Sequence, residues 1–255
     1  MKYKKLEELI AVIAKLRAPD GCPWDREQTH ESLRPNMIEE AYEAVDAIDE
    51  KSPSHLKEEL GDVLLQVLLH SQIASENKDF DIEDVANELK EKLIHRHPHV
   101  FGNTNVKDSN EVKVNWDKLK AEEKTERTSA MDGISRSMAA LMSAQKISKR
   151  AVKLGFEWPN EESLYECLYS EIEEFKQAKN EKDKQHMEEE FGDILFAAVN
   201  LARWNKIDAE QALLKANKKF EKRFRKMEEL ATKPLTEYSI EEYDNLWKQA
   251  KQRCK

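Results

Sequence analysis

Apolar residues recur along most of the chain at intervals of three and four positions, which is the spacing of an amphipathic helix. The opening segment, MKYKKLEELIAVIAKLR, shows this pattern, with charged residues between its leucines and isoleucines. No segment shows the convincing alternation of apolar and polar residues that marks a half-buried strand. We therefore expect an all-α fold, with helices near residues 4–17, 34–50, 54–76, 81–96, 109–126, 136–153, 161–179, 183–205, 208–230 and 239–253.

The composition supports long, solvated helices. The 255 residues include 6 glycines and 7 prolines, and 36% of them are charged. An average domain has about 25% charged residues and about 12% glycine plus proline. A β-rich fold needs more turn residues than this chain contains, so it is excluded first.

Charge, hydropathy and cysteine content narrow the functional classes. With 42 basic and 51 acidic residues the formal net charge is −9, so no nucleic-acid-binding surface, which needs a basic stripe, is expected. The most apolar stretch, residues 63–69, is far shorter than the ~20 residues of a membrane-spanning helix. Cys22, Cys167 and Cys254 are odd in number and far apart, which favours a cytoplasmic protein without a disulfide framework.

Two stretches of the chain repeat each other at an offset of 131 residues. MIEEAYEAV at 37–45 parallels LYSEIEEFK at 168–176, and EELGDVLL at 58–65 parallels EEFGDILF at 189–196. The pairs that obey the offset are Glu40 and Glu171, Glu43 and Glu174, Glu59 and Glu190, Gly61 and Gly192, Asp62 and Asp193, Trp116 and Trp247, and Lys120 and Lys251. We therefore expect two copies, at residues 1–127 and 128–255, with the polar stretch 122–129 as their junction.

The repeated acids form pairs three residues apart, and such pairs lie on one face of a helix. A short turn joins the two helices of each copy, so the helices should run antiparallel, and the helical rise of about 1.5 Å per residue brings the pairs to similar heights. Clustered carboxylates repel one another unless a cation neutralises them, and all-oxygen ligands suit Mg²⁺ or Mn²⁺. The expected clusters are Glu40, Glu43, Glu59 and Asp62 in the first copy and Glu171, Glu174, Glu190 and Asp193 in the second.

The surroundings of these acids favour a site over a solvated helix face. We expect the acids to interrupt a buried face, because apolar residues flank them. Gly61 and Gly192 lie inside the predicted helices, which a close helix approach or a nearby ligand would explain. The simpler alternative is that these acids form salt bridges on a solvated helix surface. The presence of the same acids in both copies makes that alternative less favourable. The flanking residues are Ile38, Ala41, Tyr42, Val45, Val63, Leu64, Ile172, Phe175, Ile194 and Leu195.

Two kinds of metal chemistry suit a carboxylate-rich helical protein. Di-iron chemistry requires Glu-x-x-His on two helices, whereas the corresponding positions here are never histidine. The other is Mg²⁺ bound to a polyphosphate. Lys219 and Arg223, four residues apart on one predicted helix, would neutralise a triphosphate, and Lys92 with Arg96 would do so more sparsely in the first copy. For any one of these cations, a solvated face is the alternative.

These motifs together resemble the MazG family of nucleoside triphosphate pyrophosphohydrolases over almost the whole chain. The segments that carry the resemblance are GCPWDREQT at 21–29, EEAYE at 39–43, ELGD at 59–62, RHPHVF at 96–101, EIEE at 171–174, EFGD at 190–193, VNLAR at 199–203 and KANKKFEKRF at 215–224. The resemblance implies tandem all-α repeats with four-helix-bundle cores completed by homodimerisation. It also implies Mg²⁺-dependent conversion of NTPs, ATP among them, and dNTPs to monophosphate and pyrophosphate, with broad base tolerance and a role in clearing nucleotide pools.

By the same resemblance, the second cluster would hold the catalytic Mg²⁺ and the first cluster would bind metal likewise. Asn200, Lys219 and Arg223 would bind nucleotide or phosphates, and Trp247 would stack on the base. Glu39 corresponds to Ser170, so the two copies need not be equally active, and the richer basic complement favours the second.

The expected chemistry is in-line attack of water on the α-phosphorus with release of pyrophosphate. The general base is open: it is one of the ligand glutamates or Glu189. Two alternatives remain. One is a narrower all-α pyrophosphohydrolase of the dUTP or phosphoribosyl-ATP type, and the other is a non-catalytic, nucleotide-sensing helical dimer.

Overall fold

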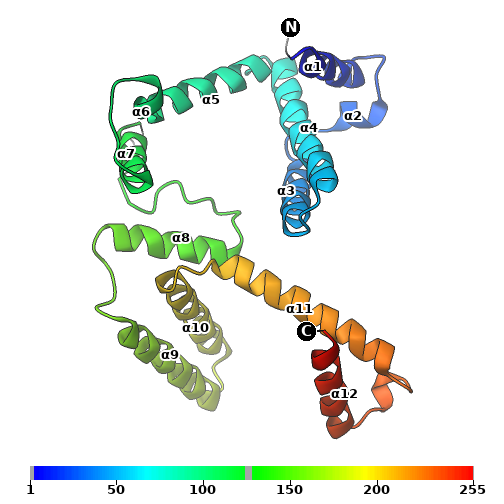
Figure 1. Ribbon diagram of the computed structural model, residues 1–255, viewed down its shortest axis with the longest axis vertical. Helices are drawn as coiled ribbons and strands as arrows, with labels where there is room; N and C mark the ends of the chain where they lie inside the picture. Colours follow the sequence, from blue (N-terminus) through cyan, green and yellow to red (C-terminus); the bar gives the residue numbers. More distant parts are fainter. Residues whose placement is uncertain (1–2, 124–127, 255) are drawn as a thin grey trace. The chain divides into compact units, whose positions relative to one another are not determined.

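The computed structural model describes residues 3–123 and 128–254, and within these ranges all regular structure is helical (Figure 1). The expected all-α class is therefore confirmed. By internal contacts the chain separates into two compact units, residues 1–124 and 125–255. Among the described helices, none combines the length and the apolar character that a membrane crossing requires.

The first unit is organised around an antiparallel hairpin of two long helices, α3 and α4. Helix α1 packs on α4, and their buried apolar residues form a small core with Ile13, Leu68, Leu69 and Ile73 at its centre. Each such side chain contributes about 1.5–3 kcal/mol when fully buried. The helices of this unit are α1 (Lys4–Arg17), α2 (Pro23–Glu27), α3 (Arg34–Asp49), α4 (Pro53–Asn77), α5 (Ile82–Arg96), α6 (Pro98–Phe101) and α7 (Ser109–Glu122).

The second unit contains two hairpins, formed by α9 with α10 and by α11 with α12. Helix α8 packs on α10, and a separate small core, including Met227, Leu246 and Ala250, joins α11 to α12. Its elements are α8 (Ala140–Lys153), α9 (Glu161–Glu181), α10 (Lys184–Trp204), α11 (Ala209–Leu230), a 3-10 turn η1 (Leu235–Glu237) and α12 (Ile240–Arg253).

Matching turns hold the α3/α4 and α9/α10 hairpins antiparallel. Lys51 and Lys182 adopt positive φ angles of 55° and 60°, which end the preceding helix sharply. Ser52 and Asp183 then cap the following helices by accepting backbone N–H bonds with their side chains. These local signals place the acids of each hairpin opposite one another.

The helix predictions were close, and the differences are confined to short elements and helix ends. The short helices α2 and α6 were missed, because each is a single turn begun by proline within a Gly/Pro-containing segment. Helix α8 begins at Ala140, four residues after the predicted start at 136. The predicted helix at 109–126 is helical as far as Glu122, and its residues 124–126, like part of the expected junction at 122–129, lie outside the described residues.

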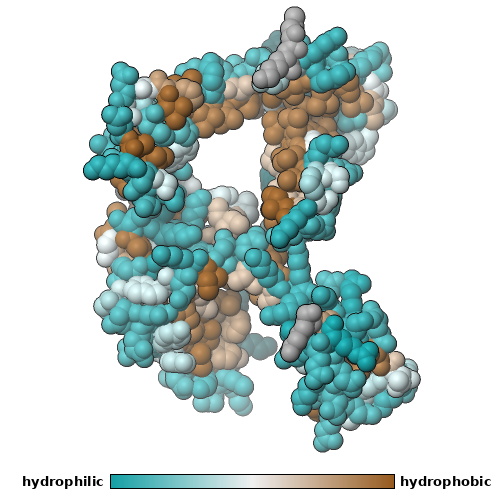
Figure 2. All heavy atoms as spheres, in the orientation of Figure 1, coloured by the Kyte–Doolittle hydropathy of each residue, from teal (hydrophilic) through white to brown (hydrophobic). Residues whose placement is uncertain are grey.

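The expectation that the acids interrupt a buried face was wrong. All ten flanking apolar residues are half-buried or exposed: Ile38, Tyr42 and Leu195 are exposed by 45%, 48% and 45%. Figure 2 shows apolar side chains at the surface of both long hairpins. Each hairpin packs against other helices on only part of its circumference. Leu64 packs against the core of the first unit, whereas the exposed flanking residues lack a cover among the described residues. The residues concerned are Ile38, Ala41, Tyr42, Val45, Val63, Leu64, Ile172, Phe175, Ile194 and Leu195.

Candidate metal centre and active site

Each long hairpin gathers three glutamates into one cluster. In the first carboxylate cluster, Glu40 and Glu43 come from α3 and Glu59 comes from α4; one oxygen of each lies within 4.8 Å of the others. The second carboxylate cluster, Glu171, Glu174 and Glu190, meets the same criterion on α9 and α10. The spacing argument therefore predicted the grouping of three of the four acids in each hairpin, while the role of these acids as ligands remains a prediction.

The fourth acid of each set, Asp62 or Asp193, acts electrostatically on its cluster. Desolvation and then the negative charge of Asp62 raise the pKa of Glu40 above its usual value. Desolvation likewise raises the pKa of Glu171, with further contributions from Glu174, Asp193 and Glu190. Four carboxylates thus interact electrostatically in each hairpin, which favours protonation or cation binding.

The buried members of the clusters carry the strongest indication of a cation. Glu59 and Glu190 are only 7% and 9% exposed. Oxygen Oε2 of Glu59 is buried and accepts no hydrogen bond from the described residues. An unpaired buried carboxylate oxygen is costly, and a divalent cation with oxygen preference would satisfy it. The donor set therefore fits Mg²⁺ or Mn²⁺.

Sequence reasoning missed two histidines that contact these buried acids. His55 Nε2 lies 3.0 Å from Glu59 Oε1, and His186 Nε2 lies 3.0 Å from Glu190 Oε1. The signal was available, because His55 and His186 are also 131 positions apart.

A pocket of about 540 Å³ adjoins the second cluster. Its wall includes Glu171 and Asp193, so the pocket and the carboxylates share a boundary. Most of the other wall surface is apolar and comes from α8, the loop at 154–160, α9 and α10. The wall also includes Phe156, Trp158, Cys167, Phe196, Asn200 and Arg203.

Polar contacts shape this pocket. Buried Asn200 accepts a 2.5 Å hydrogen bond from Ser148 Oγ and donates one of 3.1 Å to the carbonyl of Phe196. Arg203 donates two hydrogen bonds, of 2.7 and 2.6 Å, to Glu157. This pair lowers the pKa of Glu157 and ties the loop that carries Trp158 to α10.

Cys167 also lines the pocket, where its thiol donates to Glu171 Oε1 over 3.6 Å. Desolvation and the nearby Glu171 carboxylate raise the pKa of the thiol. A protonated thiol is a poor nucleophile. Cys167 therefore acts in this contact as a hydrogen-bond donor to Glu171.

The predicted phosphate and base contacts lie on other helices of the second unit. Lys219 and Arg223 belong to α11, and Trp247 belongs to α12. The Trp247 ring lies 5.3 Å from that of Phe220 and packs at the core of the α11/α12 hairpin. Among the described residues that line the 540 Å³ pocket, only Asn200 belongs to the predicted nucleotide-binding set.

The corresponding basic residues of the first unit are engaged on α5. Arg96 Nε donates to Glu123 Oε1 at 3.0 Å, and its guanidinium lies 5.3 Å from the centre of the Trp116 ring. Lys92 pairs with Glu88 at 3.2 Å. The structure therefore shows both cations in contacts that do not involve the first cluster.

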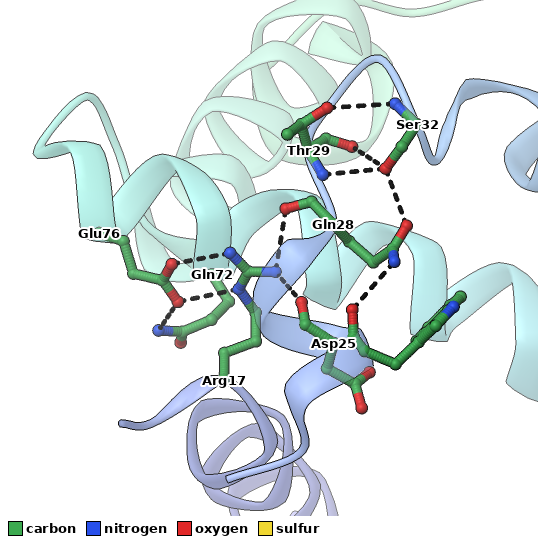
Figure 3. Close-up of polar contacts among 8 residues, drawn as sticks. Arg17, Asp25, Gln28, Thr29, Ser32, Gln72 and Glu76 are labelled. Atoms are coloured by element: carbon green, nitrogen blue, oxygen red, sulfur yellow. Dashed lines mark hydrogen bonds and ion pairs between the residues drawn. The ribbon is translucent and has the colours of Figure 1, made fainter. Parts of the chain in front are cut away.

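Arg17, on α1, holds the GCPWDREQT segment at residues 21–29 and links it to Glu76 on α4 (Figure 3). Nε and Nη2 of Arg17 donate to Glu76 at 2.9 Å each, and Nη1 donates to the carbonyl of Gln28 at 3.2 Å. Gln28 Nε2 in turn donates to the carbonyl of Trp24, whose side chain is 57% exposed.

Comparison with known proteins agrees with the geometry. A model of the MazG nucleotide pyrophosphohydrolase domain matches residues 28–101 and again residues 159–227. The chain is 49% identical to the nucleoside triphosphate pyrophosphohydrolase/pyrophosphatase MazG of Thermotoga maritima, over 96% of this chain and 95% of the relative. It is 40% identical to a nucleoside triphosphate pyrophosphohydrolase of Escherichia coli K12, over 98% of each. The chain therefore belongs to the MazG family and carries its domain twice.

Proposed function

We propose that the chain hydrolyses nucleoside and deoxynucleoside triphosphates to monophosphate and pyrophosphate with the help of Mg²⁺. One observation carries the proposal: Glu171, a member of the second carboxylate cluster, and Asp193, which acts on it electrostatically, both line the 540 Å³ pocket. A cation site for phosphates thus adjoins a cavity of the size that small-molecule ligands occupy. The names of the Thermotoga and Escherichia relatives support this substrate class.

Different residues serve the phosphates and the base of the nucleotide. We assign the cation to Glu171, Glu174, Glu190 and Asp193, and in the first unit to Glu40, Glu43, Glu59 and Asp62. When bound, Mg²⁺ supplies charge neutralisation for the phosphates and acidifies water. Phe156, Trp158 and Phe196 offer the base apolar and aromatic surfaces. Aromatic surfaces accept every base by its face, which supports broad base tolerance.

The proposal also assigns basic residues to the negative charge of the polyphosphate. We keep Lys219 and Arg223 as the predicted contacts of the polyphosphate and Trp247 as a predicted contact of the base, although none of the three lines the 540 Å³ pocket. Lys92 and Arg96 are the counterparts of the two cations in the first unit. Arg223 Nε is buried without a hydrogen-bond partner, which is consistent with an acceptor supplied by a ligand or a second chain.

Homodimerisation is the remaining structural part of the proposal. The exposed apolar residues beside the acids, including Ile38, Tyr42, Phe191 and Leu195, form surfaces of the kind that a partner covers. Gly61 and Gly192 support this, because a Cβ atom at either position would meet none of the described residues within 4 Å. The close approach expected at these glycines is thus not made by the described part of the chain, and we propose a ligand or a partner copy instead.

We place the main activity in the second unit, where the pocket adjoins the cluster, and the physiological role in clearing cytoplasmic nucleotide pools. The three free cysteines suit a reducing compartment. A narrower substrate range and a purely sensing role are the competing proposals.

Product analysis by chromatography tests these proposals. The protein is incubated with a mixture of NTPs and dNTPs, with and without Mg²⁺. Mg²⁺-dependent monophosphate and pyrophosphate from several bases is the expected result. Consumption of a single nucleotide would indicate a narrower enzyme, diphosphate with phosphate would show that the wrong bond was assigned, and no turnover with Mg²⁺ or Mn²⁺ would favour the sensing role.

A further inference from the structure

We propose that His55 and His186 are positioning residues, which orient the buried carboxylates of Glu59 and Glu190 for a divalent cation. The inference rests on the metal-binding role given to these acids in the proposed function. It concerns two three-residue arrangements, here called the histidine bridges: Glu50–His55–Glu59 and Glu181–His186–Glu190.

The first histidine bridge crosses the turn between α3 and α4. Glu50 directly follows α3, and its Oε2 lies 2.8 Å from His55 Nδ1. The opposite ring nitrogen, Nε2, lies 3.0 Å from Glu59 Oε1, one helical turn further along α4. Both neighbours are carboxylates, which accept hydrogen bonds, so each ring nitrogen that carries a proton donates to the carboxylate it faces. The backbone N–H of His55 also donates to Ser52 Oγ, which fixes the start of the helix.

The second histidine bridge repeats this arrangement between α9 and α10. His186 Nε2 lies 3.0 Å from Glu190 Oε1, and Nδ1 lies 3.8 Å from Glu181 Oε2. The backbone N–H of His186 donates to the capping side chain of Asp183. Each member of this bridge follows its counterpart by 131 residues. Two separately folded hairpins thus hold their most buried glutamate in the same way.

The contact decides which carboxylate oxygen is left for a cation. In Glu59 the histidine occupies Oε1, while Oε2 is buried without a hydrogen-bond partner. A carboxylate held at one oxygen has less rotational freedom to lose when the other oxygen binds a cation. Hydrogen bonds of this kind to metal ligands are typically worth about 10–100-fold in metal affinity or activity.

The histidines themselves contribute little to the cores. Their side chains are 37% and 39% exposed, whereas those of the glutamates that they contact are 10% and 11% exposed. Replacing a histidine therefore removes a hydrogen bond from the acid without leaving a large cavity. This separates the proposed role from simple packing.

Direct Mn²⁺ binding to the full chain, followed by electron paramagnetic resonance, tests the proposal. We expect His186→Ala to weaken one class of Mn²⁺ site by about 10-fold and His55→Ala to weaken the other. His186→Gln should restore most of the affinity, because its side-chain amide keeps an N–H donor at similar reach. Glu188→Gln, which neutralises an exposed acid on the same helix, serves as the matched control.

Turnover provides a second readout. His186→Ala should raise the Mg²⁺ concentration needed for half-maximal rate by a similar factor and leave kcat at saturating Mg²⁺ much less affected. An unchanged Mn²⁺ isotherm in His186→Ala would overturn the proposal. Equal losses in His186→Ala and His186→Gln, together with equally lowered melting temperatures, would also overturn it and show a structural staple.

The outcome is separable from that of the proposed function. A protein whose Mn²⁺ affinity falls in the histidine variants as expected, but which hydrolyses no nucleotide, would uphold the positioning role and reject the activity. A wild-type protein that binds no Mn²⁺ would overturn the positioning role regardless of turnover.

Discussion

Around the second carboxylate cluster, α8, α10 and the loop at 154–160 surround a pocket of about 540 Å³. The pocket described in the first unit is about 200 Å³ and is lined by α1, α4 and the beginning of α5, away from the acids of the first cluster. Trp24 and Trp158 are 134 positions apart, close to the offset of the repeat. Trp158 lines the larger pocket, whereas Trp24 is 57% exposed. The same acid spacing thus lies in two different surroundings.

Two arginines account for part of this difference. Arg203, on α10 of the acid hairpin, holds Glu157 and with it the loop that forms the pocket wall. Arg17, on α1, holds Glu76 and the loop carbonyls of the first unit instead (Figure 3). Helix periodicity thus reproduces a carboxylate cluster in both units, while the pocket beside it depends on how the adjoining loop is held.

Removing the buried acid of each cluster should produce the largest contrast. We expect Glu190→Ala to reduce turnover roughly 100-fold or more, since even hydrogen-bond partners of ligands are worth about 10–100-fold. Glu59→Ala should reduce it far less, because the 540 Å³ pocket adjoins the second cluster. Steady-state rates and circular dichroism measure both, and the helices should stay folded. Full activity of Glu190→Ala would reject the assignment of the second site.

Replacing the paired tryptophans should give the next largest contrast. A base–aromatic contact is worth about 1–3 kcal/mol, so Trp158→Ala should raise KM for NTPs by roughly 10-fold. Trp24→Ala should leave KM nearly unchanged, because Trp24 is exposed on the first-unit loop. Equal effects of the two substitutions on KM would show that the 540 Å³ pocket is not the nucleoside site.

Metal and pH should act together on stability. Desolvation and the charges of the neighbouring acids raise the pKa of Glu171. Its protonation therefore stabilises the metal-free protein fully below the pKa of the unfolded chain, and this contribution is lost as pH rises through the raised folded pKa. We expect Mg²⁺, compared with EDTA, to raise the melting temperature more at pH 8 than at pH 5.

Glu171→Gln is the control for this effect, since it removes the titrating group from the second cluster and leaves the first intact. It should reduce the difference between the Mg²⁺-induced shifts at the two pH values. Identical Mg²⁺ shifts at pH 5 and pH 8 in the wild-type protein would contradict the expected competition between protons and cation.

The helical glycines should give the smallest effect. Gly61→Ala and Gly192→Ala should each stabilise the chain by up to about 1 kcal/mol through helix propensity, because an added Cβ meets nothing within 4 Å. Urea denaturation measures this gain. We expect activity to fall only in Gly192→Ala, where substrate or a partner copy approaches the active cluster. Unchanged activity in Gly192→Ala would show that nothing approaches this position.

Much of the fold and half of the site geometry could be predicted from the chain alone. The acids at Glu40, Glu43 and Glu59 were placed together from helical rise and a short turn, and the structure brings them within 4.8 Å. The prediction of a buried face failed, because periodicity identifies an apolar stripe but not whether another element covers it. Ile38 and Tyr42 are exposed for this reason.

The sequence by itself determined the helices, the duplication and the facing of the acids, because these follow from short-range spacing and from a fixed offset between the copies. The pairing of Glu157 with Arg203, the place of Trp158 in a pocket wall and the position of Lys219 on a separate hairpin follow from the packing of the helices. Those outcomes depend on contacts between segments far apart in the chain, where burial and loop position outweigh local propensity.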